Sequence, residues 1–112
     1  MTLLIERGGP KALAPRWVVY EVDCPDGCKY VGITQNLTKR LDRHLRGEAA
    51  QFTKRHGYVG GKAVAVFGSE KRAKQAERER VLLLNEQGIV ARGAGWTNDN
   101  APNLLPVPRG GV

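Results

Sequence analysis

The sequence predicts an α+β fold, a small three-stranded antiparallel sheet with flanking helices in the order ββαβα. Three observations in the 112-residue chain predict it. Residues 17–34 are rich in β-branched and aromatic residues around a central turn, which is typical of a β-hairpin. Residues 36–47 change to a leucine spacing of four, which is helical. A short strand over 62–68 then precedes a longer helical stretch over 69–88. A chain of this length has room for one modest core, so these elements form one domain.

The hairpin consists of arms over 17–24 and 28–34, joined by the turn "PDG". Proline presets the backbone of such a turn, and glycine is free to adopt a positive φ. Tyr20 and Tyr30 stand at nearly corresponding places on the two arms. The pattern leaves two interpretations open, ordinary strand aromatics or two phenols brought together for chemistry.

The helix after the hairpin begins at Asn36, a residue type that is favoured as an N-cap. Leu37, Leu41 and Leu45 recur every four residues and predict the buried side of this helix. Gly47 is predicted to end it.

The second half of the chain alternates loop, strand and helix. Residues 48–61 are predicted to be a loop with a basic centre, followed by the strand over 62–68. Ser69 caps the longer helix, and Gly88 stops it. Beyond this point, glycine, asparagine and proline predict irregular structure packed near Trp96. The predicted divisions are a mobile N-terminal segment over 1–16, a folded domain over 17–98 and an irregular C-terminal tail over 99–112.

Lysine and arginine outnumber the acidic residues 18 to 11, which gives a net charge of +7 and a pI of about 9.9. Such a surplus attracts polyanions, although a merely soluble basic protein fits the total charge equally well. The position of the charge favours nucleic acid, because basic residues are concentrated between residues 36 and 62. The candidate nucleic-acid-binding residues are Lys39, Arg43, Lys54, Arg55, His56 and Lys62.

Apolar runs are short throughout the chain. None approaches the roughly 18 residues of a membrane span. The apolar patch near the first residue is followed directly by Glu6 and is too short for the core of a signal peptide. The sequence therefore predicts a cytoplasmic protein with no membrane partner.

Two cysteines, Cys24 and Cys28, flank the hairpin turn. Together with His44 and His56 they are candidates for a Cys2His2 zinc site. The two histidines are separated by residues 45–55, however, which is a wider spacing than such sites use. Half-buried strand thiols are the favoured interpretation.

Arg40 and His44 on the first helix are spaced i, i+4 and project from one face beside the leucines. A polar pair at this position requires a partner or a function.

Glu77 lies on the second helix in line with Ala73, Val81 and Leu84, where the pattern requires an apolar residue. Burying an unpaired carboxylate is costly. An ion pair with Arg80 or with an arginine of the first helix is one solution, and a metal ion is the other. Periodicity alone favours the ion pair.

Five pieces of the sequence, in order and correctly spaced, resemble the GIY-YIG nuclease superfamily. The pieces are "VVY", "YVG", "TQNLTKRLDRH", "GEAAQFTKRH" and the glutamate of "AKQAE". They run from about residue 17 to residue 84. The resemblance is to the small single-domain bacterial branch, which is related to the N-terminal nuclease domain of UvrC repair proteins.

The resemblance implies a phosphodiesterase that uses one divalent metal ion, Mg²⁺ or Mn²⁺, and no small-molecule cofactor. Tyr20 and Tyr30 match the two motif tyrosines, one of which is taken to deprotonate the attacking water. Arg40 matches the arginine that holds the scissile phosphate, and His44 matches a histidine near the first tyrosine. Glu77 matches the single metal-binding carboxylate.

The resemblance thus implies an endonuclease that hydrolyses DNA. It leaves open whether the substrate is duplex, branched, single-stranded or damaged DNA, or RNA. The late asparagine of the family has no clear counterpart, and Asn85 and Asn98 are the candidates for it. One rival hypothesis is a basic nucleic-acid-binding module of the same fold with little activity. A second rival is a zinc-stabilised structural domain.

Overall fold

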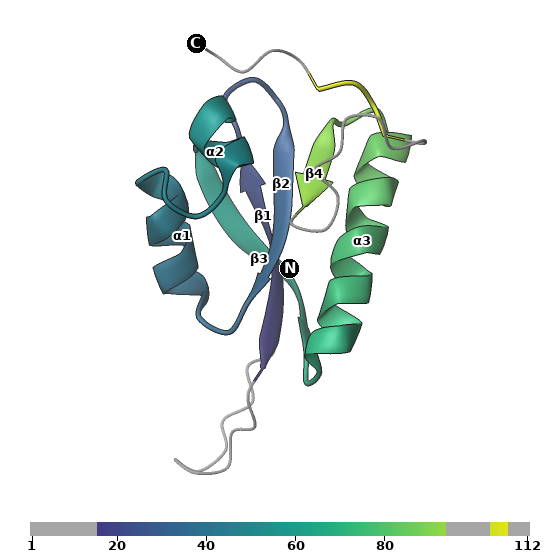
Figure 1. The fold of residues 1–112 in the computed structure, drawn as a ribbon. Coiled ribbons are helices and arrows are strands. Elements are labelled where there is room, and N and C mark those ends of the chain that lie inside the picture. Colours follow the sequence, from purple (N-terminus) through teal and green to yellow (C-terminus); the bar gives the residue numbers. More distant parts are fainter. Residues whose placement is uncertain (1–15, 94–103, 108–112) are drawn as a thin grey trace.

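A computed structural model describes residues 16–93 and 104–107 of the chain (Figure 1). The elements in chain order are β1 (Trp17–Asp23), β2 (Lys29–Thr34), α1 (Leu37–Leu45), α2 (Gln51–His56), β3 (Gly60–Phe67), α3 (Glu70–Glu86) and β4 (Ala91–Gly93). Figure 1 shows α1 and α2 on one side of the sheet and α3 on the other. The predicted α+β class is confirmed.

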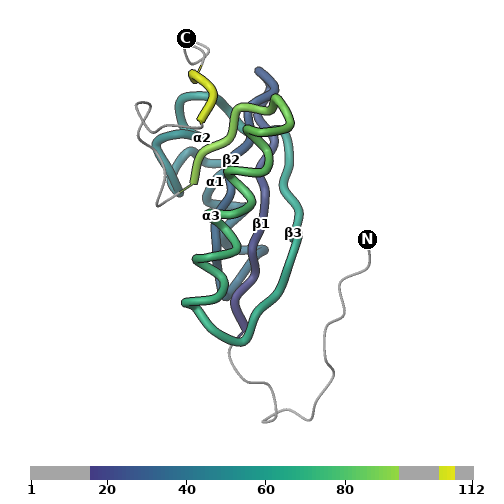
Figure 2. The backbone as a smooth tube through the Cα atoms, turned by 90° about the vertical axis from the view of Figure 1, so that its right-hand side faces the viewer, coloured from purple at the N-terminus to yellow at the C-terminus, as the bar shows by residue number. Residues whose placement is uncertain are grey.

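The sheet has four strands in the order β3-β1-β2-β4. β1 pairs antiparallel with both β2 and β3, which run beside it along its length (Figure 2). β4 pairs parallel with β2, so the sheet is mixed. The prediction of three antiparallel strands is therefore wrong. β4 has only three residues, too few to show an alternation, and its pairing depends on the path of the chain after α3.

The hairpin forms as predicted. Its strands pair in register up to Asp23 and Lys29, and the Cys24 amide donates to the Cys28 carbonyl at 3.0 Å beyond that pair. Gly27 in the turn has a φ of 88°, a conformation that glycine adopts without steric cost.

Helix α1 begins where the sequence predicts, because the Asn36 side chain accepts a hydrogen bond from the Lys39 backbone N–H. Its buried side differs from the prediction. Leu45 is 63% exposed, whereas the neighbouring His44 is buried and faces the sheet. The leucine stripe thus stops after Leu41, and a histidine takes the next position on the buried side.

Helix α2 lies within the segment that is predicted to be a loop. It is a six-residue helix whose N-cap, Ala50, makes no side-chain capping hydrogen bond. A helix this short, without a capping signal, has little periodicity to detect. It nevertheless buries Thr53 and His56.

Helix α3 is capped by Ser69, which accepts from the Arg72 backbone N–H, and the chain after it turns at Gly88 with a φ of 88°. Both limits confirm the prediction. Its buried residues are Ala73, Glu77, Val81, Leu84 and Asn85.

Each face of the sheet has its own apolar cluster. On the α3 side, the buried residues are Val19, Val31, Ala73, Val81, Leu84 and Ala91. On the side of α1 and α2, they are Tyr20, Val22 and Tyr30. The two tyrosines therefore share a face, and α1 and α2 cover it.

Little of the predicted terminal segments is described. Trp96 and residues 1–15 lie outside the described residues. Within the described part of the tail, Leu104 packs against the α3 cluster, and the Leu105 amide donates to the Asn85 side chain at 2.9 Å. Among the described residues, no helix combines the length and apolarity that crossing a membrane requires.

Candidate active site

The Tyr20 side chain lies across the neighbouring strand at Gly32, its cross-strand partner. A β-carbon at position 32 would stand 2.5 Å from the Tyr20 hydroxyl oxygen. Only glycine leaves room for the phenol here. The last residue of the "YVG" motif therefore positions the first motif tyrosine.

A chain of hydrogen bonds runs from Tyr20 into the two helices that cover it. The Tyr20 hydroxyl is 2.8 Å from Nε2 of His44 on α1. Nδ1 of the same ring is 2.8 Å from Oγ1 of Thr53 on α2. The Thr53 hydroxyl in turn donates to the Ala50 carbonyl at 3.3 Å. All three side chains are buried, so these bonds are shielded from water.

Tyr30 stands beside the same histidine. Its ring centroid is 5.3 Å from that of His44 and 6.1 Å from that of Phe52. Burial raises the pKa of the Tyr30 phenol above its ordinary value, and the charges of Tyr20 and Glu77 act in the same direction. Tyr30 is thus a neutral phenol at neutral pH.

Arg40 projects from α1 towards Tyr20. Burial raises the pKa of the Tyr20 phenol, while the Arg40 guanidinium beside it opposes this rise. Arg40 also donates to the Ile33 carbonyl at 3.5 Å. An open groove of about 300 Å³ runs past Arg40 between α1 and β1; its lining residues are Trp17, Thr34, Gln35, Asn36, Lys39, Arg40 and Arg43.

The ring of His44 is neutral at neutral pH. Burial lowers its pKa to about 4, and the positive charges of Arg40 and Arg43 add to the effect. A neutral imidazole has one nitrogen that accepts a hydrogen bond and one that donates. His44 can therefore accept a hydrogen bond from the Tyr20 hydroxyl.

Glu77 lies on α3 and is only 5% exposed. One of its carboxylate oxygens packs against Gly93 of β4, where a β-carbon would stand 2.5 Å from it. The Val31 carbonyl oxygen lies 2.9 Å from the same point. The negative charge of Glu77 raises the pKa of both Tyr20 and Tyr30, after the larger effect of burial. The charge of this carboxylate thus acts on both phenols.

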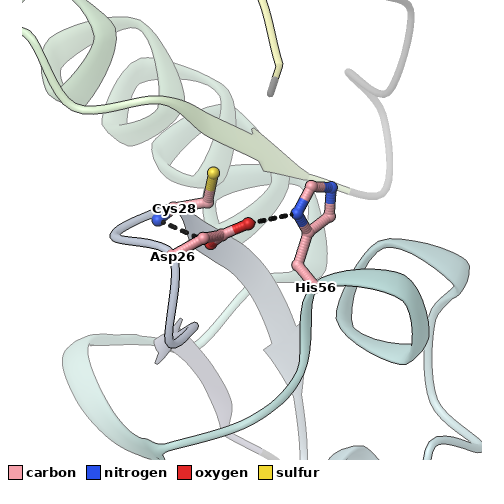
Figure 3. A group of neighbouring side chains, drawn as sticks. All are labelled: Asp26, Cys28 and His56. Carbon is pink, nitrogen blue, oxygen red and sulfur yellow. Dashed lines mark hydrogen bonds and ion pairs between the residues drawn. The ribbon is translucent and has the colours of Figure 1, made fainter. Parts of the chain in front are cut away.

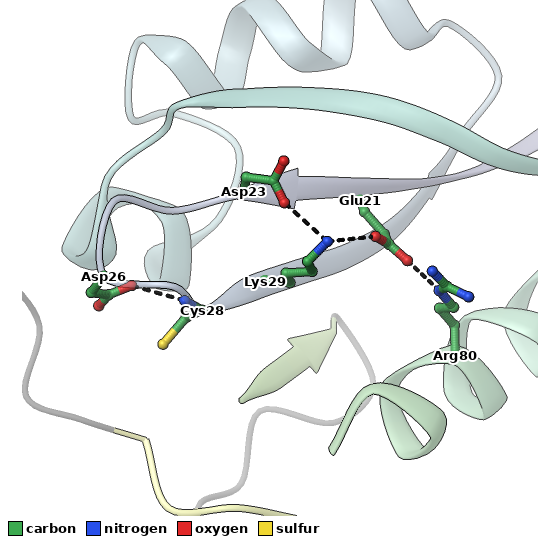
Figure 4. Close-up of polar contacts among 6 residues, drawn as sticks. All are labelled: Glu21, Asp23, Asp26, Cys28, Lys29 and Arg80. Carbon is green, nitrogen blue, oxygen red and sulfur yellow. Dashed lines mark hydrogen bonds and ion pairs between the residues drawn. The ribbon is translucent and has the colours of Figure 1, made fainter. Parts of the chain in front are cut away.

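Arg80, the ion-pair partner considered for Glu77, donates instead to the buried carboxylate of Glu21 on β1 (Figure 4). Lys29 pairs with the other oxygen of Glu21 at 3.3 Å and with Asp23 at 3.2 Å. This network links α3 to the hairpin and neutralises the carboxylate of Glu21.

The predicted nucleic-acid-binding residues divide into three groups. Lys39 and Arg43 are exposed along the groove beside Arg40. Lys54 and Arg55 are exposed on α2. The remaining two, His56 and Lys62, lie elsewhere.

Lys62 is exposed on β3, where it is the cross-strand partner of Glu21. Cross-strand partners point to the same face of a sheet, so Lys62 is on the α3 side, opposite Tyr20. His56 is buried and its Nδ1 lies 2.6 Å from Asp26. The structure does not bring these two residues to the groove.

Asp26, Cys28 and His56 form a cluster whose ligand-type atoms lie within 4.8 Å of one another (Figure 3). Two ligands of one tetrahedral zinc ion stand roughly 3.3 Å apart, whereas Asp26 and His56 approach to 2.6 Å. That separation is typical of a hydrogen bond. Asp26 also accepts from the Cys28 amide at 3.1 Å, so this cluster fastens the hairpin turn to α2.

The Cys2His2 site considered from the sequence does not assemble. His44 bonds to Tyr20 and Thr53, and both cysteines are free, buried thiols.

Sequence reasoning missed three residues that shape the site. Gly32 and Gly93 admit the side chains of Tyr20 and Glu77, and the glycine of the "YVG" motif was a visible signal for the first. Thr53 stands in the piece "GEAAQFTKRH", but its role was not recognised because α2 was not predicted. Of the two candidate late asparagines, Asn98 lies outside the described residues. Asn85 donates to the Val81 and Ala91 carbonyls at 2.7 and 3.0 Å, which fixes the end of α3 to β4.

Comparison with known proteins gives a consistent result. The family described as the GIY-YIG catalytic domain matches residues 16–88. A UPF0213 protein of Xanthomonas campestris is 33% identical over 94 residues, covering 83% of this chain and 85% of its own. A UPF0213 protein of Halalkalibacterium halodurans is 33% identical over 83 residues, covering 71% of this chain and 88% of its own. No solved structure matches the chain.

Proposed function

The chain belongs to the GIY-YIG catalytic domain family, and from this membership we propose that it is a metal-dependent endonuclease that hydrolyses phosphodiester bonds in DNA. The observation that carries the proposal is the buried hydrogen bond between Tyr20 and His44, formed beside Arg40. A strand tyrosine that served only packing would have no need of this arrangement.

Tyr20 and His44 act together as the base. Because burial raises the pKa of Tyr20, the phenol is protonated at neutral pH and cannot act through a standing tyrosinate. Its oxygen takes the proton of the attacking water while its own proton passes to His44 Nε2, 2.8 Å away. Tyr30 lies against the same imidazole and helps to exclude water from it.

Arg40 holds the scissile phosphate. Its side chain lines the open groove, and its positive charge acts on the Tyr20 phenol, so a phosphate bound there stands beside the base. A guanidinium donates two parallel hydrogen bonds to phosphate oxygens and stabilises the charge that develops during attack. Lys39, Arg43, Lys54 and Arg55 extend the positive surface along the backbone of the nucleic acid.

The residues present fit one hard divalent cation, Mg²⁺ or Mn²⁺. Such ions prefer oxygen ligands and bind through one or two carboxylates together with waters and substrate phosphate. Glu77 supplies a buried carboxylate whose charge acts on both phenols, and no second carboxylate is needed. When bound, the cation polarises the phosphate and stabilises the leaving oxygen.

The test is a cleavage assay on duplex, branched, single-stranded and damaged DNA, with Mg²⁺, with Mn²⁺ and with a chelator. We expect metal-dependent cleavage of at least one substrate, and loss of that cleavage in His44→Gln. DNA binding without cleavage under every condition would instead identify a basic nucleic-acid-binding module of the same fold.

A further inference from the structure

The hydrogen bonds around His44 have a definite direction, which begins at a backbone carbonyl. The Ala50 carbonyl can only accept, so the Thr53 hydroxyl at 3.3 Å must donate its single proton to it. The Thr53 oxygen is then left to accept from His44 Nδ1 at 2.8 Å. This order requires that the proton of the neutral imidazole resides on Nδ1.

The other nitrogen of the ring faces Tyr20. With its proton on Nδ1, the neutral imidazole has only an acceptor at Nε2, and the Tyr20 hydroxyl oxygen lies 2.8 Å from it. The Tyr20 hydroxyl therefore donates to Nε2. The donors of Tyr20, His44 and Thr53 thus all point the same way, towards the Ala50 carbonyl.

We propose that Thr53 is a positioning residue that holds His44 in the Nδ1–H tautomer, so that Nε2 accepts the Tyr20 proton during hydrolysis. This role rests on the proposed endonuclease function. The hydroxyl of Thr53 never contacts the substrate and acts through the imidazole alone. Its place on α2, packed beside α1, makes the correct tautomer depend on the docking of the two helices.

The proton balance of the step is closed. One O–H bond of water breaks and its proton goes to the Tyr20 oxygen, while the water oxygen forms the bond to phosphorus and the bond to the leaving oxygen breaks. The Tyr20 O–H bond breaks in turn, and its proton goes to His44 Nε2. The resulting imidazolium donates to Thr53 from Nδ1 and to Tyr20 from Nε2, so neither nitrogen loses its partner. The leaving oxygen keeps the electron pair of its bond and takes a proton from solvent, and His44 returns a proton to solvent after the step.

Two substitutions distinguish the effect of the Thr53 hydroxyl from the effect of the shape of its side chain. Thr53→Val keeps the branched shape and removes the hydroxyl, whereas Thr53→Ser keeps the hydroxyl and removes the methyl group. The chain has two histidines, so ¹⁵N NMR of untagged protein can report the His44 tautomer, with His56→Gln used to assign the signals. We expect Nδ1–H in the wild type and in Thr53→Ser, and a large fraction of Nε2–H in Thr53→Val.

Cleavage kinetics provide the second readout. We expect Thr53→Val to lower kcat at least tenfold with DNA affinity changed less than twofold, and Thr53→Ser to remain within threefold of the wild type. Loss of a residue that fixes a catalytic histidine costs up to about 10⁴-fold in serine proteases, where the partner is charged. A neutral hydroxyl should cost less.

The two readouts distinguish failure of the Thr53 proposal from failure of the proposed endonuclease function. The role of Thr53 is overturned if the wild-type His44 carries its proton on Nε2, or if the Thr53→Val protein keeps the wild-type cleavage rate. Absence of cleavage in the wild type refutes the proposed function, and the NMR measurement alone then decides whether Thr53 fixes the imidazole. If Thr53→Val does not fold, a Thr53→Ser protein with Nε2–H or with tenfold slower cleavage overturns the proposal.

Discussion

Tyr20 on β1 and Gly32 on β2 are cross-strand partners, and the phenol of Tyr20 occupies the space that a side chain at position 32 would fill. A β-carbon there would stand 2.5 to 2.9 Å from three atoms of the phenol. The glycine thereby lets the Tyr20 hydroxyl reach His44 at 2.8 Å. Any side chain at position 32 must displace the tyrosine from its histidine.

Gly32→Ala is therefore expected to abolish measurable cleavage and to lower the free energy of unfolding by about 1–3 kcal/mol, as overpacked cores do. Gly68→Ala is the matched control, because a β-carbon at Gly68 meets nothing within 4 Å. Cleavage assays and thermal melting of both variants check this. Wild-type activity in Gly32→Ala would show that the position of the Tyr20 phenol is not critical.

Removal of the phenolic hydroxyl tests the base directly. Tyr20→Phe keeps the ring but removes the hydrogen bond to His44, so stability should change by about 1 kcal/mol. Its cleavage rate should fall at least about a hundredfold, as expected for loss of a general base. Tyr30→Phe should lower the cleavage rate by a smaller factor. The measurement is the single-turnover cleavage rate. Equal rates for Tyr20→Phe and the wild type would show that Tyr20 serves packing alone.

Glu77→Gln separates the metal-site role of Glu77 from a structural one. The amide has nearly the same size but is a weaker ligand for hard cations. We expect a folded protein that binds DNA as well as the wild type, or slightly better, and does not cleave it. Mg²⁺-dependent nicking and thermal stability measured on one sample decide the matter. Lower stability with nicking retained would contradict the metal-site assignment.

Glu21→Gln is expected to give the opposite result, a less stable protein that still cleaves DNA. It therefore serves as the control for Glu77→Gln. The Glu21 carboxylate is buried between Arg80 and Lys29, so its neutralisation leaves charged partners poorly satisfied. We expect a loss of about 1–3 kcal/mol in the free energy of unfolding, with the cleavage rate of the folded protein retained. Thermal melting and the same nicking assay apply.

Salt dependence tests the basic surface. Each phosphate contact on duplex DNA contributes about 0.9 to the slope of log affinity against log salt. Arg43→Glu and Lys54→Glu should weaken binding to all sequences and reduce this slope. Lys74→Glu on α3 carries the same charge change outside the groove and should have a smaller effect. A flat salt dependence in the wild type would exclude nucleic acid as the main partner.

The pKa of His44 makes the stability of the fold pH-dependent. Burial and the charges of Arg40 and Arg43 lower this pKa to about 4, below the ordinary value of about 6.5 for an unfolded chain. Between these values the unfolded state binds a proton that the folded state does not. Stability is therefore full above about pH 6.5 and falls by about 3 kcal/mol as the pH drops to 4. Denaturation at several pH values should show this slope, and His44→Gln should reduce it.

The sequence by itself determined the features that depend on neighbouring residues. The hairpin turn, the caps at Asn36 and Ser69 and the buried row that contains Glu77 all formed as predicted. A cap joins groups three residues apart, and a periodic row repeats within one helix, so the information for each lies in a few adjacent positions. Placement of both tyrosines on one face follows from their positions on paired strands.

Only the tertiary structure decided which partners the buried polar groups take. The Tyr20–His44 bond spans 24 residues of sequence, and the pair of Glu21 with Arg80 spans 59. Neither contact leaves a periodic signal in the chain. The same holds for β4, whose parallel pairing depends on the chain returning to β2 after α3, and for Thr53, which reaches His44 because α2 docks beside α1. These choices depend on the packing of whole elements, because a buried polar group bonds to whichever partner that packing brings within reach.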